Sequence, residues 1–168
     1  SAGAERRAAI LRSEPAASPW LGAHEIFAGV AQSLRARVQQ PANMGELAWG
    51  LWPGPVDRWD DGNRTRVKLY GGALASATAG AVLSGVNLFA IENAGEWEIV
   101  QARGCELVGG NEYELAGLLR GCLGSGHAMA SPHPAGARFV VLDRRLIRAD
   151  VAAHEWGEAL SFLAPPSG

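Results

Sequence analysis

The sequence predicts a mainly β protein, an antiparallel sandwich or a partly closed barrel of about eight or nine short strands with one short helix. Two observations lead to this expectation. The chain holds 22 glycines and 9 prolines among its 168 residues, which suits a chain that turns often. Between these turns lie short runs in which apolar and polar residues alternate with the period of a strand.

A single domain is the expected organisation, because 168 residues can bury one sizeable core but not two comfortable ones. Residues 1–18 are expected to form a flexible arm or linker, since Pro15 and Pro19 end the short helical pattern there. Residues 19–160 are expected to form the β domain. The Pro/Ser/Gly-rich residues 161–168 are expected to be a linker.

The first half of the domain is predicted to contain four short strands, in the ranges 24–30, 33–40, 45–52 and 64–70. Trp49 shares a strand face with Leu47 and Leu51, so we expect it in the core. In the fourth strand, Val67 and Leu69 are expected to point inward and the polar residues between them outward.

One short helix is predicted after these strands. Thr78 can cap its N-terminus, and Val82, Leu83 and Val86 give it one apolar side. The apolar run that follows the helix is predicted to be a buried strand, which turns at Asn93 into the next one.

The clearest hairpin of the sequence covers residues 96–121. With a loop of three residues at its tip, Leu107 faces Tyr113 and Cys105 faces Leu115. This register agrees with the apolar alternation on both arms.

The same register predicts two free thiols. Cys122 would lie opposite Glu98, about 23 Å along the strand from Cys105, which is far beyond the reach of a disulfide. Gly104 is the position at which a bulge could alter this spacing.

A last hairpin is predicted about Asp143 and Arg144, within residues 136–151. The segment that begins at His154 is expected to start as a strand.

Several kinds of function are disfavoured by composition. A formal net charge of −2 argues against a nucleic-acid groove or an anionic membrane surface as the main partner. No apolar run approaches the length of about 18 residues that a membrane helix needs. The four histidines have no metal-binding spacing, so we expect no metal and no cofactor.

Nucleophilic catalysis is also not expected. Cys122 and His127 could pair as nucleophile and base, but no third group to orient the histidine and no oxyanion donors can be identified. A hydrolase using these two residues is therefore the weakest hypothesis, and the chain is predicted not to be an enzyme. His127 and His133 flank a loop rich in Gly and Pro and are expected to be exposed.

The acidic pair Asp60-Asp61 is predicted to belong to a turn. Followed by Gly62 and Asn63, these carboxylates are typical turn residues before a strand. Adjacent carboxylates in a strand would point to opposite faces, which does not suit the paired acids of a glycosidase.

The tryptophans leave two possibilities open. Trp52 and Trp59 bracket the run Pro53-Gly54-Pro55 and are expected to be partly exposed. Exposed tryptophans bind sugars or pack against a neighbouring protein. With Asp60 nearby, they are the candidate binding residues for either kind of partner.

Four blocks of the sequence together resemble a known family. They are PANMGEL, RWDDGNRTRVKLYGGALAS, GEWEIVQARGCELVGGNEYELAGLLRG and PAGARFVVLD. In this order they are similar to the C-terminal part of the large baseplate protein of gene transfer agents and related phage tails. The resemblance covers about residues 19–160. The loop from Cys122 to His127 departs from the family pattern, in which Gln followed by Gly-Thr is more usual.

The resemblance implies a structural domain that acts in tail-tip assembly, with contact to the host envelope as a further expectation. Implied partners are other copies of the chain and neighbouring tail or baseplate proteins. The implied location is the tail tip of a virion or phage-like particle made in the bacterial cytoplasm. The family's sugar-hydrolase-like barrel lies outside these blocks, so the resemblance supplies no catalytic residues. The alternative function is a carbohydrate-binding module that recognises a cell-surface glycan through Trp52, Trp59 and Asp60.

Overall fold

A computed structural model describes residues 24–29, 32–129, 131–147 and 150–165 of the chain. It is mainly β and contains a six-stranded antiparallel barrel with extra strands and one short α-helix, which confirms the predicted fold class. Contacts divide the chain into two compact units, residues 42–143 and the two flanking segments together.

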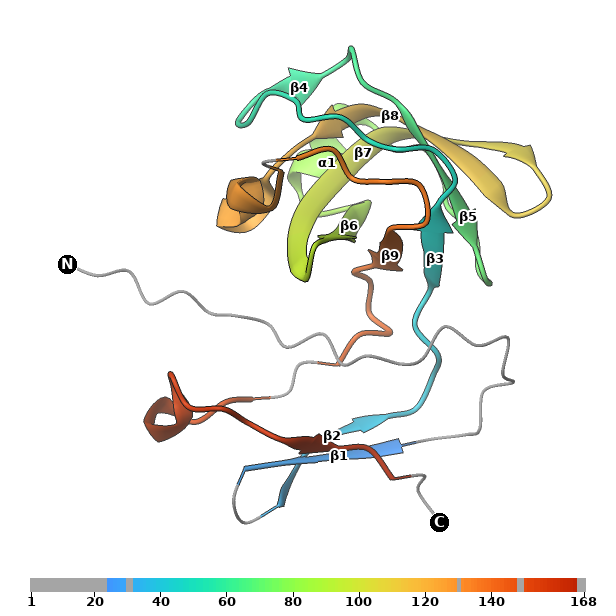
Figure 1. The fold of residues 1–168 in the computed structure, drawn as a ribbon. Helices are drawn as coiled ribbons and strands as arrows, with labels where there is room; N and C mark the ends of the chain where they lie inside the picture. The colour runs from blue at the N-terminus through green and yellow to red at the C-terminus, as the bar shows by residue number, and fades with distance from the viewer. Residues whose placement is uncertain (1–23, 30–31, 130, 148–149, 166–168) are drawn as a thin grey trace. The chain divides into compact units, whose positions relative to one another are not determined.

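The barrel lies within residues 42–143 (Figure 1). Its strands are β3 (Met44–Leu47), β5 (Thr65–Leu69), β6 (Leu88–Asn93), β7 (Glu96–Gly109), β8 (Glu112–Leu119) and β9 (Arg138–Val141). They pair in the order β8-β5-β3-β9-β6-β7, and the additional pairing of β7 with β8 closes the ring. The two-residue strand β4 (Trp59–Asp60) pairs with the end of β8, at Leu118 and Leu119, beyond the part of β8 that pairs with β5.

The barrel interior is filled by the inward-facing apolar side chains of its strands. The rings of Phe89 and Phe139 lie 5.0 Å apart at their centroids. Val67 and Leu69 point inward and are buried, as predicted. Further buried members of this core are Leu47, Leu51, Ile91, Val100, Leu115 and Leu118.

The predicted hairpin of residues 96–121 is confirmed in register. Leu107 pairs with Tyr113, and Cys105 pairs with Leu115. Its tip is tighter than expected, because the register shifts between Leu107 and Gly109. The two cysteines are free, as predicted. Figure 1 shows β7 and β8 as a long curved hairpin.

The predicted helix is α1 (Ala79–Leu83), and the Thr78 side chain accepts a bond from the amide of Ala81 at its N-terminus. Its apolar side is narrower than predicted. Val82 is buried, whereas Leu83 and Val86 are exposed. A 3-10 segment, η1 (Cys122–Met129), follows β8.

The prediction that Trp49 lies in the core is wrong, since its side chain is 47% exposed. The amides of Ala48 and Trp49 both donate to the carbonyl of Arg66, at 2.7 and 3.3 Å. This bulge sets two residues against one and interrupts the alternation of the strand. The Trp49 ring therefore turns outward and lies 3.9 Å from the Arg66 guanidinium.

The predicted hairpin about Asp143 and Arg144 is also wrong. Among the described residues after Asp143, none forms a strand beside β9. Both edges of β9 are already occupied, by β3 on one side and β6 on the other. Closure of the barrel leaves no edge on which a hairpin partner could pair.

The flanking segments form a small three-stranded sheet in the order β10-β1-β2. Its strands are β1 (His24–Ala28), β2 (Ser33–Val38) and β10 (Phe162–Leu163). The segment at His154, expected as a strand, is instead the 3-10 turn η2 (Ala153–Glu155), in which Glu155 bonds to Arg35 at 2.5 Å. The arm predicted for residues 1–18 lies outside the described residues, and one domain over 19–160 stays a prediction.

Candidate functional site

The most tightly bonded group of side chains lies inside the barrel unit, around Glu98 of β7 and Arg120 just after β8. Arg120 Nε and Nη2 donate to the two Glu98 carboxylate oxygens, each at 2.8 Å. Both side chains are fully buried. Two parallel bonds between charged groups are the strongest geometry available to an arginine and a carboxylate.

His133 and the Gly121 amide complete the shell of Glu98. His133 Nε2 lies 2.5 Å from Glu98 Oε2, and the Gly121 amide donates to Oε1 at 3.0 Å. Burial by itself would raise the pKa of Glu98, but the bonds from His133, Arg120 and Gly121 lower that pKa to about 2. Glu98 is therefore ionised at neutral pH.

The burial of His133 corrects the expectation that it lies on an exposed loop, since only 1% of its surface is exposed. The backbone of His133 bridges to Leu51 with two bonds of 2.9 Å, which seals the loop onto the barrel. Its Nδ1 lies 3.2 Å from the carbonyl oxygen of Glu92. The imidazole is therefore held from both ring nitrogens.

Arg120 also connects this network to the tryptophan-containing loop. Its Nη1 donates to the carbonyl oxygen of Trp52 at 2.6 Å and lies 3.7 Å from Asp60 Oδ2. Asp60 in turn accepts bonds from the amide and side chain of Asn63, at 3.0 and 2.8 Å. Asp60 ends β4 and a bend at Gly62 follows it, so the predicted change of direction is present, and the Asp60 carboxylate is buried beneath it.

Gly54 explains how the loop approaches Asp60 so closely. A Cβ at residue 54 would lie 2.1 Å from Asp60 Oδ2, so only glycine fits between the two flanking prolines. We call Glu98, Arg120, His133 and Asp60 the buried network. Its members are covered on all sides, so it anchors the loop and offers no open position for a ligand.

The candidate binding residues Trp52, Trp59 and Asp60 are thus placed in three different environments. The Trp52 side chain is 68% exposed. Asp60 is 4% exposed and bonded within the protein. Trp59 is half-buried, with the Arg103 guanidinium 4.4 Å from the centre of its ring.

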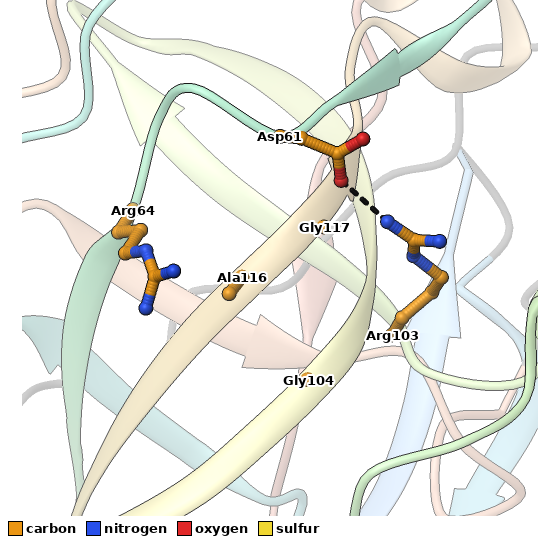
Figure 2. A pocket seen from close by; sticks show the side chains of 6 residues that line it. All are labelled: Asp61, Arg64, Arg103, Gly104, Ala116 and Gly117. Atoms are coloured by element: carbon orange, nitrogen blue, oxygen red, sulfur yellow. Dashed lines mark hydrogen bonds and ion pairs between the residues drawn. The ribbon is translucent and has the colours of Figure 1, made fainter.

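A shallow depression of about 290 Å³ lies beside Trp59, on the outer surface of β7 and β8. Sequence reasoning did not identify it. Figure 2 shows Arg64 and Arg103 on opposite sides of its floor, with Arg103 pointing toward Asp61. Its floor consists of small residues, namely Gly104, Ala116 and Gly117.

The depression exists because β7 and β8, which pair with each other, both depart from the alternation of inward and outward side chains at paired positions. On β7, Ala102 and Cys105 are both buried, so the two residues between them lie toward the outer surface. On β8, Leu115 and Leu118 are buried in the same way. Glycine inside a strand is a sequence feature that indicates such an irregularity.

The residues considered for nucleophilic catalysis are not brought together. The Cys122 thiol lies 3.5 Å from the Leu119 carbonyl oxygen and 3.9 Å from Gln101 Oε1, and burial raises its pKa. His127 instead lies 3.4 Å from Glu96 and is exposed, as predicted. Burial also raises the pKa of Cys105, to about 12. In this part of the chain no thiol is activated.

In the described ranges, no group of three or more His, Cys, Asp or Glu residues could hold a metal ion. No helix there is long and apolar enough to cross a membrane.

The barrel unit matches a family of known proteins. A family model described as Rcc01698-like, C-terminal matches residues 42–140, which is nearly the whole barrel unit. No curated protein matches the chain. The matched region contains the buried network and the depression. Because the match covers more than half of its residues, the chain belongs to the Rcc01698-like C-terminal family.

Proposed function

We propose that the chain is a non-enzymatic structural domain of a phage-tail-like baseplate protein, which acts in tail-tip assembly and contacts the host envelope. Its partners are other copies of the chain and neighbouring tail or baseplate proteins. The tail-tip setting rests on the resemblance of the four sequence blocks. The observation that carries the assembly role is the Trp52 side chain, 68% exposed on a loop that is held from below.

The backbone at Trp52 is held before any partner arrives. Its carbonyl oxygen accepts a bond of 2.6 Å from Arg120, which Glu98 fixes in turn through two bonds of 2.8 Å. A large aromatic side chain on a fixed backbone loses little conformational freedom on binding. Tryptophan in such a position is typical of the residues that contribute most to protein interfaces.

The state of the polar side chains supports a binding role rather than catalysis. Glu98 and Arg120 are bonded to each other in the interior, and the Cys122 thiol has a raised pKa with no base beside it among the described residues. An interface does not need activated groups. It needs a fixed surface, which the barrel and its anchored loop supply.

Particle assembly tests this proposal. With Trp52→Ala introduced into the complete baseplate protein, we expect a loss of tailed particles in electron micrographs. Trp156→Ala is the matched control, because this tryptophan is 61% exposed but belongs to the small three-stranded unit. Equal numbers of particles for the two variants would contradict the assembly role of Trp52.

Glycan recognition is a second candidate function, and the exposed ring of Trp52 favours it as well. If the chain recognises a glycan, we expect the purified chain to bind a cell-surface glycan on an array, and we expect Trp52→Ala to abolish the binding. Binding that survives in Trp52→Ala would remove Trp52 from the glycan site and leave the assembly role untouched.

A further inference from the structure

The depression beside Trp59 is lined by two arginines, and each of them uses only one of its guanidinium nitrogens in a hydrogen bond to a described residue. Arg64 Nη1 donates to Glu114 at 3.0 Å, and its Nε and Nη2 donate to no described residue. Arg103 Nη2 donates to Asp61, which leaves Nε and Nη1 without a partner in the same residues. Each guanidinium therefore keeps donors for a ligand.

Asp61 supplies an acceptor on the same rim. One of its oxygens receives Arg103, whereas Oδ2 receives no bond from the described part of the chain. The lining residues carry two guanidinium groups and one carboxylate, and the Glu114 carboxylate beside them is shared between Arg64 and Arg66. An arginine pair of this kind suits a single carboxylate, because the guanidinium fork matches its geometry.

The position of Arg103 is fixed from two sides. It lies 4.4 Å above the Trp59 ring and bonds to Asp61. Gly117 makes room for it, because a Cβ there would lie 2.7 Å from Arg103 Nε. A held guanidinium loses less freedom when it binds a ligand than one that moves in solvent.

The floor has almost no side chains. Gly104, Ala116 and Gly117 leave the backbone of β7 and β8 open to a ligand that lies flat. The volume of about 290 Å³ is at the lower end of the range for small-molecule sites. It suits one ring rather than a long peptide.

We propose that this depression binds a carboxylate-bearing sugar residue, with Arg64 and Arg103 receiving the carboxylate and Asp61 accepting a hydroxyl. A sugar acid presents an anion together with neighbouring hydroxyls, which matches this set of donors with one acceptor. Its lining residues do not include Trp52, Trp59 or Asp60. It is independent of the assembly role, so its failure would leave that role standing.

Binding of acidic oligosaccharides to the full chain tests the proposal. We expect a galacturonic acid oligomer to bind in calorimetry, and a neutral galactose oligomer of equal length not to bind. Arg64→Gln should weaken the affinity about tenfold or more, the effect of losing one bond to a charged group. Ala116→Leu, which fills the floor, should abolish binding.

Arg37→Gln is the matched control. Arg37 is 65% exposed and bonded to a glutamate, as Arg64 is 62% exposed and bonded to one, but it lies in the small sheet. It should leave affinity unchanged, and circular dichroism melts should show that all variants fold. Absent binding, binding equal for the neutral oligomer, or binding unaffected by Arg64→Gln and Ala116→Leu would each overturn the proposal. Binding of free acetate as tight as that of the acidic oligomer would overturn its assignment to a sugar.

Discussion

Asp60 and Asp61 are neighbours in the chain, yet one lies in the interior of the protein and the other at its surface. Asp60 lies beneath the loop, 4% exposed, and faces Arg120 in the buried network. Asp61 lies on the rim of the depression, where its side chain is 68% exposed and bonded to Arg103. The same chemistry, an aspartate beside an arginine, is therefore present once inside the protein and once at its surface.

Burial decides what each of these two ion pairs does for the protein. In the interior, removal of one partner leaves the other charge without water, so the pair holds the structure together. At the surface, water replaces a lost partner and the pair contributes little to stability. A surface pair can therefore exchange bonds with a ligand, whereas a buried pair cannot.

The largest expected effect is on the buried side of this comparison. Arg120→Leu leaves Glu98 as a buried, unpaired charge, and we expect it to lower the free energy of unfolding by about 3–5 kcal/mol. Urea titration followed by circular dichroism measures the loss. The double variant Arg120→Leu with Glu98→Leu should recover part of it, because the unpaired charge of Glu98 is then removed as well. A single variant as stable as the parent would show that the network does not anchor the barrel.

Acid should weaken the same network in a defined range of pH. The pKa of Glu98 falls from 4.5 to about 2 in the folded protein, so its contribution is complete above 4.5 and is lost as pH falls through 2. The full contribution amounts to about 3 kcal/mol. An NMR titration of labelled glutamate carboxyls should find one resonance that titrates near 2. If the Glu98 resonance titrates near 4.5 instead, the proposed bonding of Glu98 is wrong.

A smaller effect is expected at the surface. Gly117 has a φ of +59°, which costs a residue with a Cβ about 1–2 kcal/mol, and a Cβ there would displace Arg103. Gly117→Ala should therefore lower stability by about that amount and change the fluorescence of Trp59 as the guanidinium leaves its ring. Gly110→Ala is the control, since it has a similar φ of +54° but open space around it. Equal fluorescence in the two variants would contradict the contact between Arg103 and Trp59.

The local patterns of the sequence predicted much of the barrel. The register of the β7–β8 hairpin followed from alternation on both arms, and the pairing of Cys105 with Leu115 confirmed it. The inward positions of Val67 and Leu69 followed from the same period. These features depend on residues close in sequence, which is why periodicity could find them.

The features that were missed depend on contacts between distant segments. His133 is buried because its loop bridges to Leu51 and its ring meets Glu98, 35 residues away in the chain. Trp49 turned outward at a bulge that only its pairing with Arg66 creates. The hairpin predicted at Asp143 failed because barrel closure occupied both edges of β9. None of these contacts leaves a local pattern in the sequence.

The candidate site was predicted only in part. The sequence placed Asp60 and Asp61 together in a turn, but it did not predict that one would be buried and the other exposed. The role of Arg120 was not foreseen. It follows Leu118 at strand spacing, so an arginine continuing an inward-facing row was the available sign of a buried charge.

One pair of variants tests the difference between the two aspartates directly. Unfolding by urea should show Asp60→Ala to be less stable than the parent by about 2 kcal/mol or more, because a buried charge and a turn lose their partner. Asp61→Ala should lie within about 0.5 kcal/mol of the parent. Equal losses in the two variants, or a larger loss in Asp61→Ala, would contradict the division between the buried network and the depression.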